Sequence, residues 1–394
     1  MLDQLHENEV IELCRALVRE KSYSGEEKNA AEVLKAYFEK HGFDEIQIDE
    51  CGNAVGVIQG NRPGPCVVFD GHIDTVPVPD ESEWSVPPFD AVERDGRIYG
   101  RGTSDMKGGV AAMACGAALF AEKTNRDFAG KIVVAGVVQE ELFEGVASAY
   151  IADRYRPDFA VIAEASELNL KIGQRGRAEI AVETFGTPAH SAHPEKGVNA
   201  VYSMCRAAEA LKNLPMPTHP MLKKGLLVLT DIRSDPYPGS SCVPAYCRAT
   251  YDERTVTGET REAVLERING RLADLAAEDS TFRATASYAR GTGRCYTGKV
   301  IGAEKFFPAW LFSESEPYLQ SCLTELRADG FSPRLTVYDF CTNGSCYAGE
   351  RGIRTLGLGP SREELAHTID EYIEIPQLTA AVSCNIAVLR ALLR

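Results

Sequence analysis

Residues 132–138 read Ile-Val-Val-Ala-Gly-Val-Val, an apolar run without the polar alternation of a half-exposed strand. Such a strand is covered on both faces, as in a mainly parallel sheet with helices on each side. Further strands are predicted by short β-branched runs at 45–49, 54–59, 66–69 and 159–162. Helices are predicted at 8–22 and 25–42 and in the Ala-rich stretch 108–123, so the alternation indicates an α/β fold.

A different pattern begins near Ala178 and ends near Tyr288. It predicts a compact α+β unit, with strands at 179–184, 225–233, 242–251 and 282–288 and helices at 199–213 and 261–277. The α/β pattern then resumes with helices at 318–329 and 377–393 and a strand at 355–358. A chain of 394 residues with 44% hydrophobic content is long enough for two cores. We therefore expect one domain in two parts, residues 1–177 and 291–394, and an inserted domain of residues 178–290.

Side chains that can bind metal ions stand where predicted strands end. His72 follows the 66–69 strand, Glu141 follows 132–138 and Glu164 follows 159–162. Open α/β sheets place their ligands beyond the carboxyl ends of strands, so these groups should converge. Asp105 in a glycine-rich loop and His367 in a polar loop complete two imidazoles and three carboxylates, a donor set that suits paired zinc ions.

Each of these groups has a specific expected role. The two oxygens of Asp105 would bridge two cations, giving one site with His72 and Glu164 and another with His367 and Glu141. Asp74 lies two residues after His72, on the same face of a strand, and would fix the imidazole. Glu140 would accept a proton from water and pass it to a leaving nitrogen, provided that the backbone turns where the strand ends.

Taken singly, these residues have plainer explanations. His72 could be satisfied by a carbonyl, and Asp105 could be a helix-capping acid. His367 alone would be an ordinary loop histidine. The metal interpretation is favoured because all the candidates coexist.

The charge of the chain limits its partners. The formal net charge is −15, which argues against nucleic acid, because phosphate binding favours a basic face. The polar N-terminus lacks a signal-peptide pattern, and no apolar run reaches bilayer length, so we expect no membrane partner. Twelve scattered cysteines without a Cys-x-x-Cys pair indicate reduced thiols and a cytoplasmic location.

Five segments together resemble the co-catalytic zinc hydrolases of peptidase family M20, which include aminoacylases, acetylornithine deacetylases, succinyl-diaminopimelate desuccinylases and glutamate carboxypeptidases. The resemblance covers nearly the whole chain and is carried by Gly71–Pro77, Tyr99–Gly109, Gln139–Glu141, Glu164 and His367. It implies a di-zinc α/β catalytic domain and an inserted ferredoxin-like lid that forms homodimers. It also implies two Zn²⁺ per subunit, with Co²⁺ or Mn²⁺ as substitutes. The roles that it implies match those above: His72, Asp105, Glu141, Glu164 and His367 as ligands, Glu140 as base and Asp74 as the orienting acid.

The resemblance also implies roles outside the metal ligands. His190, four residues before Pro194, would reach the active site of the other subunit and stabilise the oxyanion. Arg254 would bind a substrate carboxylate, and the loop around Asn343 would contact substrate. Two segments depart from the usual family pattern, namely Ser241–Pro244 and Cys341–Ser345. Three others resemble a family branch assigned to selenium metabolism, which fixes no substrate: Tyr296–Gly298, Phe306–Trp310 and Thr342–Gly344.

We therefore expect a zinc-dependent hydrolase of the amide bond in a small N-acyl amino acid or peptide-like substrate. Glu164 favours this over an aminopeptidase, since relatives that bind a free amino group usually carry aspartate there. A ureido or carbamoyl amidohydrolase and a dipeptidase remain as alternatives on the same metal site. A catalytically silent binding dimer would lack a ligand or the base, and none is missing.

Overall fold

The computed structural model describes residues 2–394 and comprises two compact units. Unit 1 contains the residues up to Gln174, Thr292–Gly302 and Leu311–Arg394, and unit 2 contains Arg175–Gly291 and Ala303–Trp310. Unit 2 is therefore not one continuous insertion, because the chain returns to it at 303–310. The reason is β17 (Phe306–Phe307), which pairs with the first strand of unit 2.

The main sheet of unit 1 has nine strands, in the order β1-β2-β6-β3-β7-β20-β8-β18, with β19 also paired to β8. Its centre is parallel, because β3 pairs in parallel with β6 and β7, and β20 pairs in parallel with β7. The strands are β1 (Glu45–Ile48), β2 (Ala54–Gln59), β3 (Arg62–His72), β6 (Ala129–Val137), β7 (Phe159–Ile162), β8 (Leu170–Gln174), β18 (Trp310–Leu311), β19 (Leu335–Tyr338) and β20 (Arg354–Gly357).

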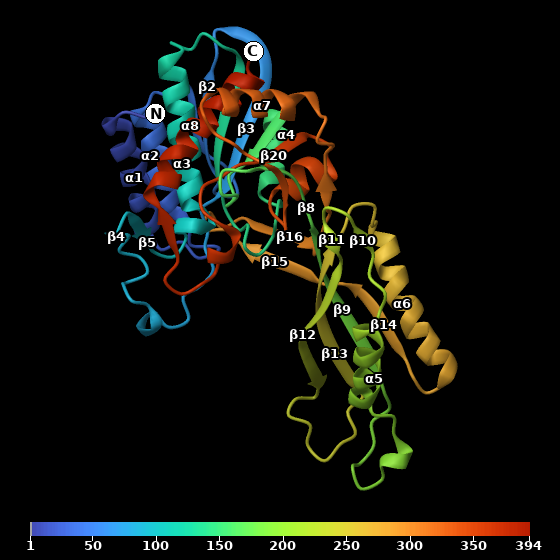
Figure 1. Cartoon of the computed structure of the whole chain (residues 1–394). Helices are drawn as coiled ribbons and strands as arrows, with labels where there is room; N and C mark the ends of the chain where they lie inside the picture. The colour runs from blue at the N-terminus through green and yellow to red at the C-terminus, as the bar shows by residue number, and fades with distance from the viewer. Residues whose placement is uncertain (1) are drawn as a thin grey trace. The chain divides into compact units, whose positions relative to one another are not determined.

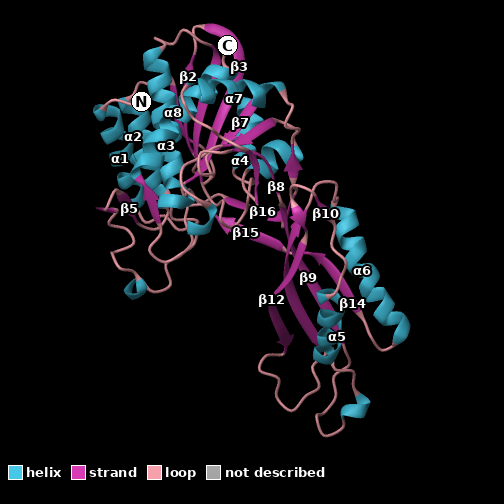
Figure 2. Ribbon diagram, viewed as in Figure 1, coloured by secondary structure: helices cyan, strands magenta, loops and turns pink. Residues whose placement is uncertain are grey.

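Helices cover this sheet. In Figures 1 and 2, α1 (Gln4–Arg19), α2 (Lys28–Lys40), α3 (Gly108–Lys123) and α8 (Ile375–Leu392) gather beside the strands. The remaining helices of unit 1 are α4 (Ser148–Tyr155) and α7 (Pro317–Ala328). Small sheets are formed by β4 (Val92–Arg94), β5 (Arg97–Tyr99) and β21 (Tyr372–Glu374), and by β15 (Arg290–Arg294) and β16 (Val300–Glu304).

The Ala-rich helix α3 is buried over most of its length. A Cβ on Gly109 would lie 2.1 Å from the carbonyl oxygen of Ala163, so glycine allows the start of α3 to approach the end of β7. The neighbouring helix α8 is long and apolar enough to cross a membrane, with a mean hydropathy of 1.3. It is 56% buried and packs against α3 and α7, as a core helix of a folded domain does.

Unit 2 follows the order β9 (Gly176–Phe185), α5 (Ala200–Lys212), β12 (Leu226–Asp235), β13 (Tyr246–Thr255), α6 (Arg261–Glu278) and β14 (Ala284–Tyr288). Its antiparallel sheet has the order β12-β13-β9-β14, the arrangement of a ferredoxin-like fold. A short hairpin joins β10 (Thr218–His219) to β11 (Lys223–Lys224).

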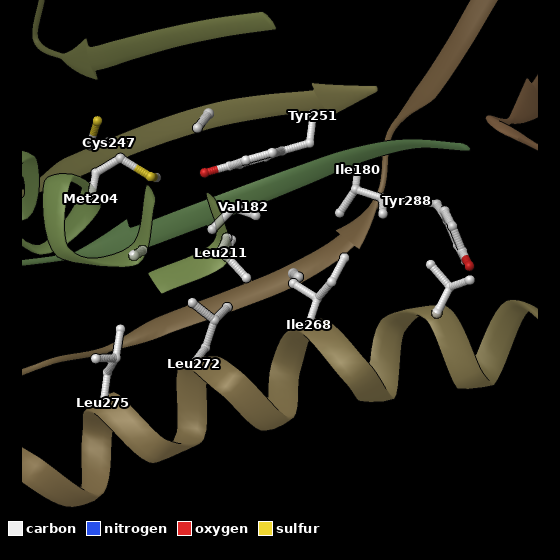
Figure 3. Close-up of a cluster of buried hydrophobic side chains, with 14 of the residues drawn as sticks. Ile180, Val182, Met204, Leu211, Cys247, Tyr251, Ile268, Leu272, Leu275 and Tyr288 are labelled. Atoms are coloured by element: carbon white, nitrogen blue, oxygen red, sulfur yellow. The ribbon is translucent and has the colours of Figure 1, made fainter. Parts of the chain in front are cut away.

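The core of unit 2 lies between its sheet and the two helices, as Figure 3 shows. Ile268, Leu272 and Leu275 recur at helical spacing along one face of α6 and pack toward Ile180 and Val182 of β9. Strand β13 begins four residues later than the sequence predicted. Pro244, which has no N–H to donate to a ladder, precedes its start.

Candidate metal centre

The four adjacent parallel strands of unit 1 each lead to a candidate ligand. His72 is the last residue of β3, Glu141 follows the end of β6, and Glu164 follows the end of β7. Strand β20 leads into the loop that carries His367. The carboxyl ends of these strands share one edge of the sheet, so the topology brings together residues far apart in sequence.

Asp105 lies between the two imidazoles. Its Oδ1 is 3.0 Å from Nε2 of His72, and its Oδ2 is 3.1 Å from Nε2 of His367. One carboxylate therefore faces a different histidine with each oxygen. This arrangement would suit a carboxylate shared between two cations.

Two further carboxylates complete the pattern. Oε1 of Glu164 is 3.5 Å from Nε2 of His72, and Oε2 of Glu141 is 3.0 Å from Nε2 of His367. The donor atoms of His72, Asp105 and Glu141 lie within 4.8 Å of one another. A second close group of donor atoms consists of His72, Glu140 and Glu164. The structure therefore brings Glu140 into this cluster together with the expected ligands, and Asp105 contacts both histidines.

The donor set fits divalent cations better than it fits a metal-free core. Burial raises the pKa of Glu164, and it raises that of Glu141 to about 7 with help from the charge of Asp105. Hydrogen bonds to Asp105 and Glu141 raise the pKa of His367 to about 10. The cluster therefore needs positive charge, which divalent ions bound by its nitrogen and oxygen donors would supply.

Glu140 reaches the same site as its neighbour because the backbone turns. Strand β6 ends at Val137, and Gln139 has a left-handed φ of 61°. Glu140 is only 6% exposed, and its Oε2 lies 3.9 Å from Nε2 of His72, beyond hydrogen-bonding distance. Both acids of the pair therefore face the cluster, as the sequence reasoning required.

Asp74 orients His72 through its main chain rather than through its carboxylate. The Nδ1 atom of His72 is 2.9 Å from the carbonyl oxygen of Asp74 and 3.7 Å from its Oδ1. The carboxylate instead accepts the backbone N–H groups of Glu140 at 3.0 Å and Glu141 at 3.2 Å. Asp74 thus contacts both the histidine and the turn that carries the acid pair.

Glu371 is a supporting residue that the sequence reasoning missed. Its buried carboxylate accepts N–H groups from Gly102, Ser104 and Asp105, and it pairs with Arg101 at 2.7 Å. These bonds hold the glycine-rich loop that carries Asp105. No local motif marks Glu371, because its partners are more than 260 residues away in the sequence.

The loop residue Asn343 does not have the surroundings of a substrate-binding group. It is 2% exposed, its Nδ2 donates to Asp70 at 2.8 Å, and its Oδ1 accepts the N–H of Gly145 at 2.6 Å. The expectation of a substrate contact is therefore replaced by a role inside the protein.

His190 and Arg254 lie in unit 2. His190 is exposed and forms a β-bridge with Cys242, and its Nδ1 accepts the N–H of Ala192 at 3.0 Å. Arg254, near the end of β13, pairs through Nε with Asp252 at 2.9 Å and keeps 29% of its side chain exposed.

The chain matches a known family over most of its length. The sequence profile of peptidase family M20/M25/M40 matches residues 68–391. An uncharacterised protein of Escherichia coli K12, YgeY, is 32% identical over 366 residues, which cover 91% of this chain and 88% of YgeY.

Other similar proteins have more specific names. Succinyl-diaminopimelate desuccinylase 2 of Ruegeria sp. TM1040 is 27% identical over 390 residues, covering 95% of this chain and 93% of the relative. Among solved structures, the YXEP protein of Bacillus subtilis, a dinuclear metal-binding peptidase of the M20 family, superimposes with a TM-score of 0.70. That structure is 14% identical and covers 98% of this chain and 99% of its own, so it shows a shared fold.

Proposed function

Because the chain belongs to peptidase family M20/M25/M40, a family of hydrolases that act on C–N bonds, we propose that it hydrolyses the amide bond of a small N-acyl amino acid or peptide-like substrate. The observation that carries the proposal is Asp105, whose two oxygens face His72 and His367, while Glu140 lies buried beside them. Desuccinylation by the Ruegeria relative is chemistry of this class.

Two divalent metal ions, most simply Zn²⁺, would occupy the cluster. His72, Asp105 and Glu164 would hold one ion, and His367, Asp105 and Glu141 would hold the other. When bound, the ions would supply Lewis acidity, which polarises a carbonyl group and lowers the pKa of water.

Glu140 is the proposed general base. Its carboxylate takes a proton at Oε2 from the attacking water and delivers that proton to the leaving nitrogen. Asp74 supports this step from behind, because its carboxylate holds the backbone N–H groups of Glu140 and Glu141. The base is thereby held beside the ligands without being one of them.

His190 is proposed to stabilise the oxyanion of the tetrahedral intermediate. Because Nδ1 accepts the N–H of Ala192, a neutral imidazole carries its proton on Nε2 and can donate there. Such a donor suits an oxygen that gains negative charge in the transition state. We propose that His190 serves the active site of a partner subunit.

The partner would be a second copy of this chain. Strand β12 is the edge strand of its sheet, and it exposes 45% of Leu226, 51% of Val228 and 46% of Ile232. An edge strand with exposed apolar side chains favours pairing with another strand. We propose that β12 pairs with the same strand of a second subunit about a two-fold axis.

Arg254 is the proposed contact for the carboxylate of the substrate. A guanidinium can bind a carboxylate with two parallel N–H groups, and Arg254 uses Nε for Asp252. The same residue would serve a deacylase and a dipeptidase, because both substrates can end in a carboxylate.

The proposed location is the cytoplasm. All twelve cysteines are free thiols, and most of them are buried. Free thiols at this density are typical of a reducing compartment.

A substrate panel tests the function. The zinc-loaded protein is incubated with N-acetyl and N-succinyl amino acids, dipeptides and N-carbamoyl amino acids, and release of the free amine is followed. We expect the highest kcat/KM on an N-acyl amino acid. Preference for an N-carbamoyl substrate or a dipeptide would select one of the alternative amidohydrolases, whereas ligand binding without hydrolysis of any substrate would mean a silent binding protein.

Metal content tests the proposed ligand sets. We expect about two zinc ions per chain in the purified protein and a loss of both from Asp105→Asn, because Asp105 is the shared ligand. Glu164→Gln should weaken mainly one ion, since it touches only the His72 group. Elemental analysis after dialysis measures both variants, and full retention of two ions by Asp105→Asn would refute the bridging role.

A further inference from the structure

Asp70 is a buried carboxylate on β3, two residues before His72 and on the same face of the strand. Its Oδ1 accepts Nδ2 of Asn343 at 2.8 Å. Its Oδ2 accepts the hydroxyl groups of Ser148 at 2.7 Å and Tyr347 at 2.9 Å. All four side chains are buried, so their hydrogen bonds are shielded from competing water.

The hydrogen-bond partners of Asp70 contact the loop of residues 138–147, which joins β6 to α4. Ser148 is the first residue of α4, and Asn343 in turn accepts the N–H of Gly145 through Oδ1. The far end of the loop is therefore tied to β3 by Asp70. The near end is tied to the same strand end by Asp74, which holds the N–H groups of Glu140 and Glu141.

We propose that Asp70 and Asn343, with Ser148 and Tyr347, form a positioning cluster that holds the 138–147 loop so that Glu140 and Glu141 face His72. This inference rests on the proposed function, which gives the loop its catalytic and metal-binding tasks. The cluster acts through the loop. Its members are therefore positioning residues rather than catalytic ones.

The chemistry of the pair allows an exchange experiment. Asn343→Asp places a second carboxylate at the 2.8 Å contact with Asp70, where a donor is needed. Adding Asp70→Asn restores the contacts of Asp70, because the new amide donates to the carboxylate introduced at position 343 while its oxygen accepts from Ser148 and Tyr347. Asp70→Asn alone leaves a mismatch whichever way its amide turns, because its NH₂ group then faces either Nδ2 of Asn343 or the hydroxyl groups of Ser148 and Tyr347.

The measurements are zinc affinity by chelator competition, kcat/KM, and amide hydrogen exchange of residues 138–147 in metal-free protein. Asn343→Asp should weaken zinc binding and lower kcat/KM by about 10- to 100-fold, as loss of a supporting partner does, and should speed exchange in the loop. The double variant should return all three to within about threefold of wild type. The matched control is Asp158→Asn, which should change none of the three measurements. Asp158 accepts a hydrogen bond from the N–H of Cys66 at 2.8 Å, toward the opposite end of β3.

The proposed role of the cluster would be overturned if folded Asn343→Asp kept the zinc affinity, loop exchange and kcat/KM of the wild type. It would also be overturned if the double variant did not recover them. If Asn343→Asp does not fold, Ser148→Ala replaces it; unchanged zinc affinity and loop exchange in that variant would be equally negative. Exchange is measured without metal, so it separates this inference from the proposed function. If the wild-type protein hydrolyses no substrate, the proposed function is rejected. If the double variant nevertheless recovers the protection of the loop from exchange, the cluster still holds the 138–147 loop.

Discussion

Glu140→Gln should retain about two zinc ions per chain and lose about 10²- to 10⁴-fold in kcat, the range expected for removal of a general base. The physical reason is that Glu140 belongs to neither of the proposed ligand groups, yet its Oε2 lies 3.9 Å from Nε2 of His72. Glutamine keeps the size and the hydrogen-bonding capacity of the side chain but cannot accept the proton. The check is elemental analysis and steady-state kinetics on one preparation.

The adjacent acid is the matched comparison. Glu141→Gln changes the same functional group one residue later, but Oε2 of Glu141 contacts Nε2 of His367 at 3.0 Å. We therefore expect Glu141→Gln to lose metal as well as activity. Near-normal turnover by Glu140→Gln, or equal loss of metal from both variants, would remove Glu140 from the proposed role of base.

The strand ends were the part of the site that sequence reasoning predicted well. An uninterrupted apolar run such as 132–138 indicates a strand buried on both faces, and a polar group directly after such a run has to lie at the edge of the sheet. That logic predicts that Glu141 and Glu164 lie near His72. Membership of the family and the α/β fold are confirmed by the profile match over residues 68–391.

The supporting contacts could not be predicted, because they depend on tertiary proximity rather than local pattern. Glu371 holds the loop of Asp105 from a distant segment, and nothing in its neighbouring sequence indicates that partner. The family resemblance implied a substrate contact for Asn343, but the fold turns its side chain inward to Asp70. The sequence pattern placed residues 303–310 in the first domain, but in the structure they belong to unit 2, because β17 pairs with β9.

His190→Ala should lower kcat by about 10²- to 10³-fold, which is the usual effect of removing one oxyanion donor, while the metal content stays unchanged. His190 is in unit 2, and no metal-ligand candidate lies in that unit among the described residues. The proposal that it serves a partner subunit predicts more than this loss of activity. It predicts that two inactive variants complement each other.

Mixing His190→Ala with Glu140→Ala subunits and allowing them to exchange should recover about a quarter of wild-type activity. Random exchange makes half of the dimers mixed, and each mixed dimer has one site with an intact Glu140 and an intact His190 from its neighbour. A Val228→Lys change on β12, which puts a charge on the proposed dimer edge, should abolish the recovery and yield monomers by light scattering. If subunits exchange, as shown by mass-tagged chains, and activity still does not return, His190 acts within its own subunit or has no part in the reaction.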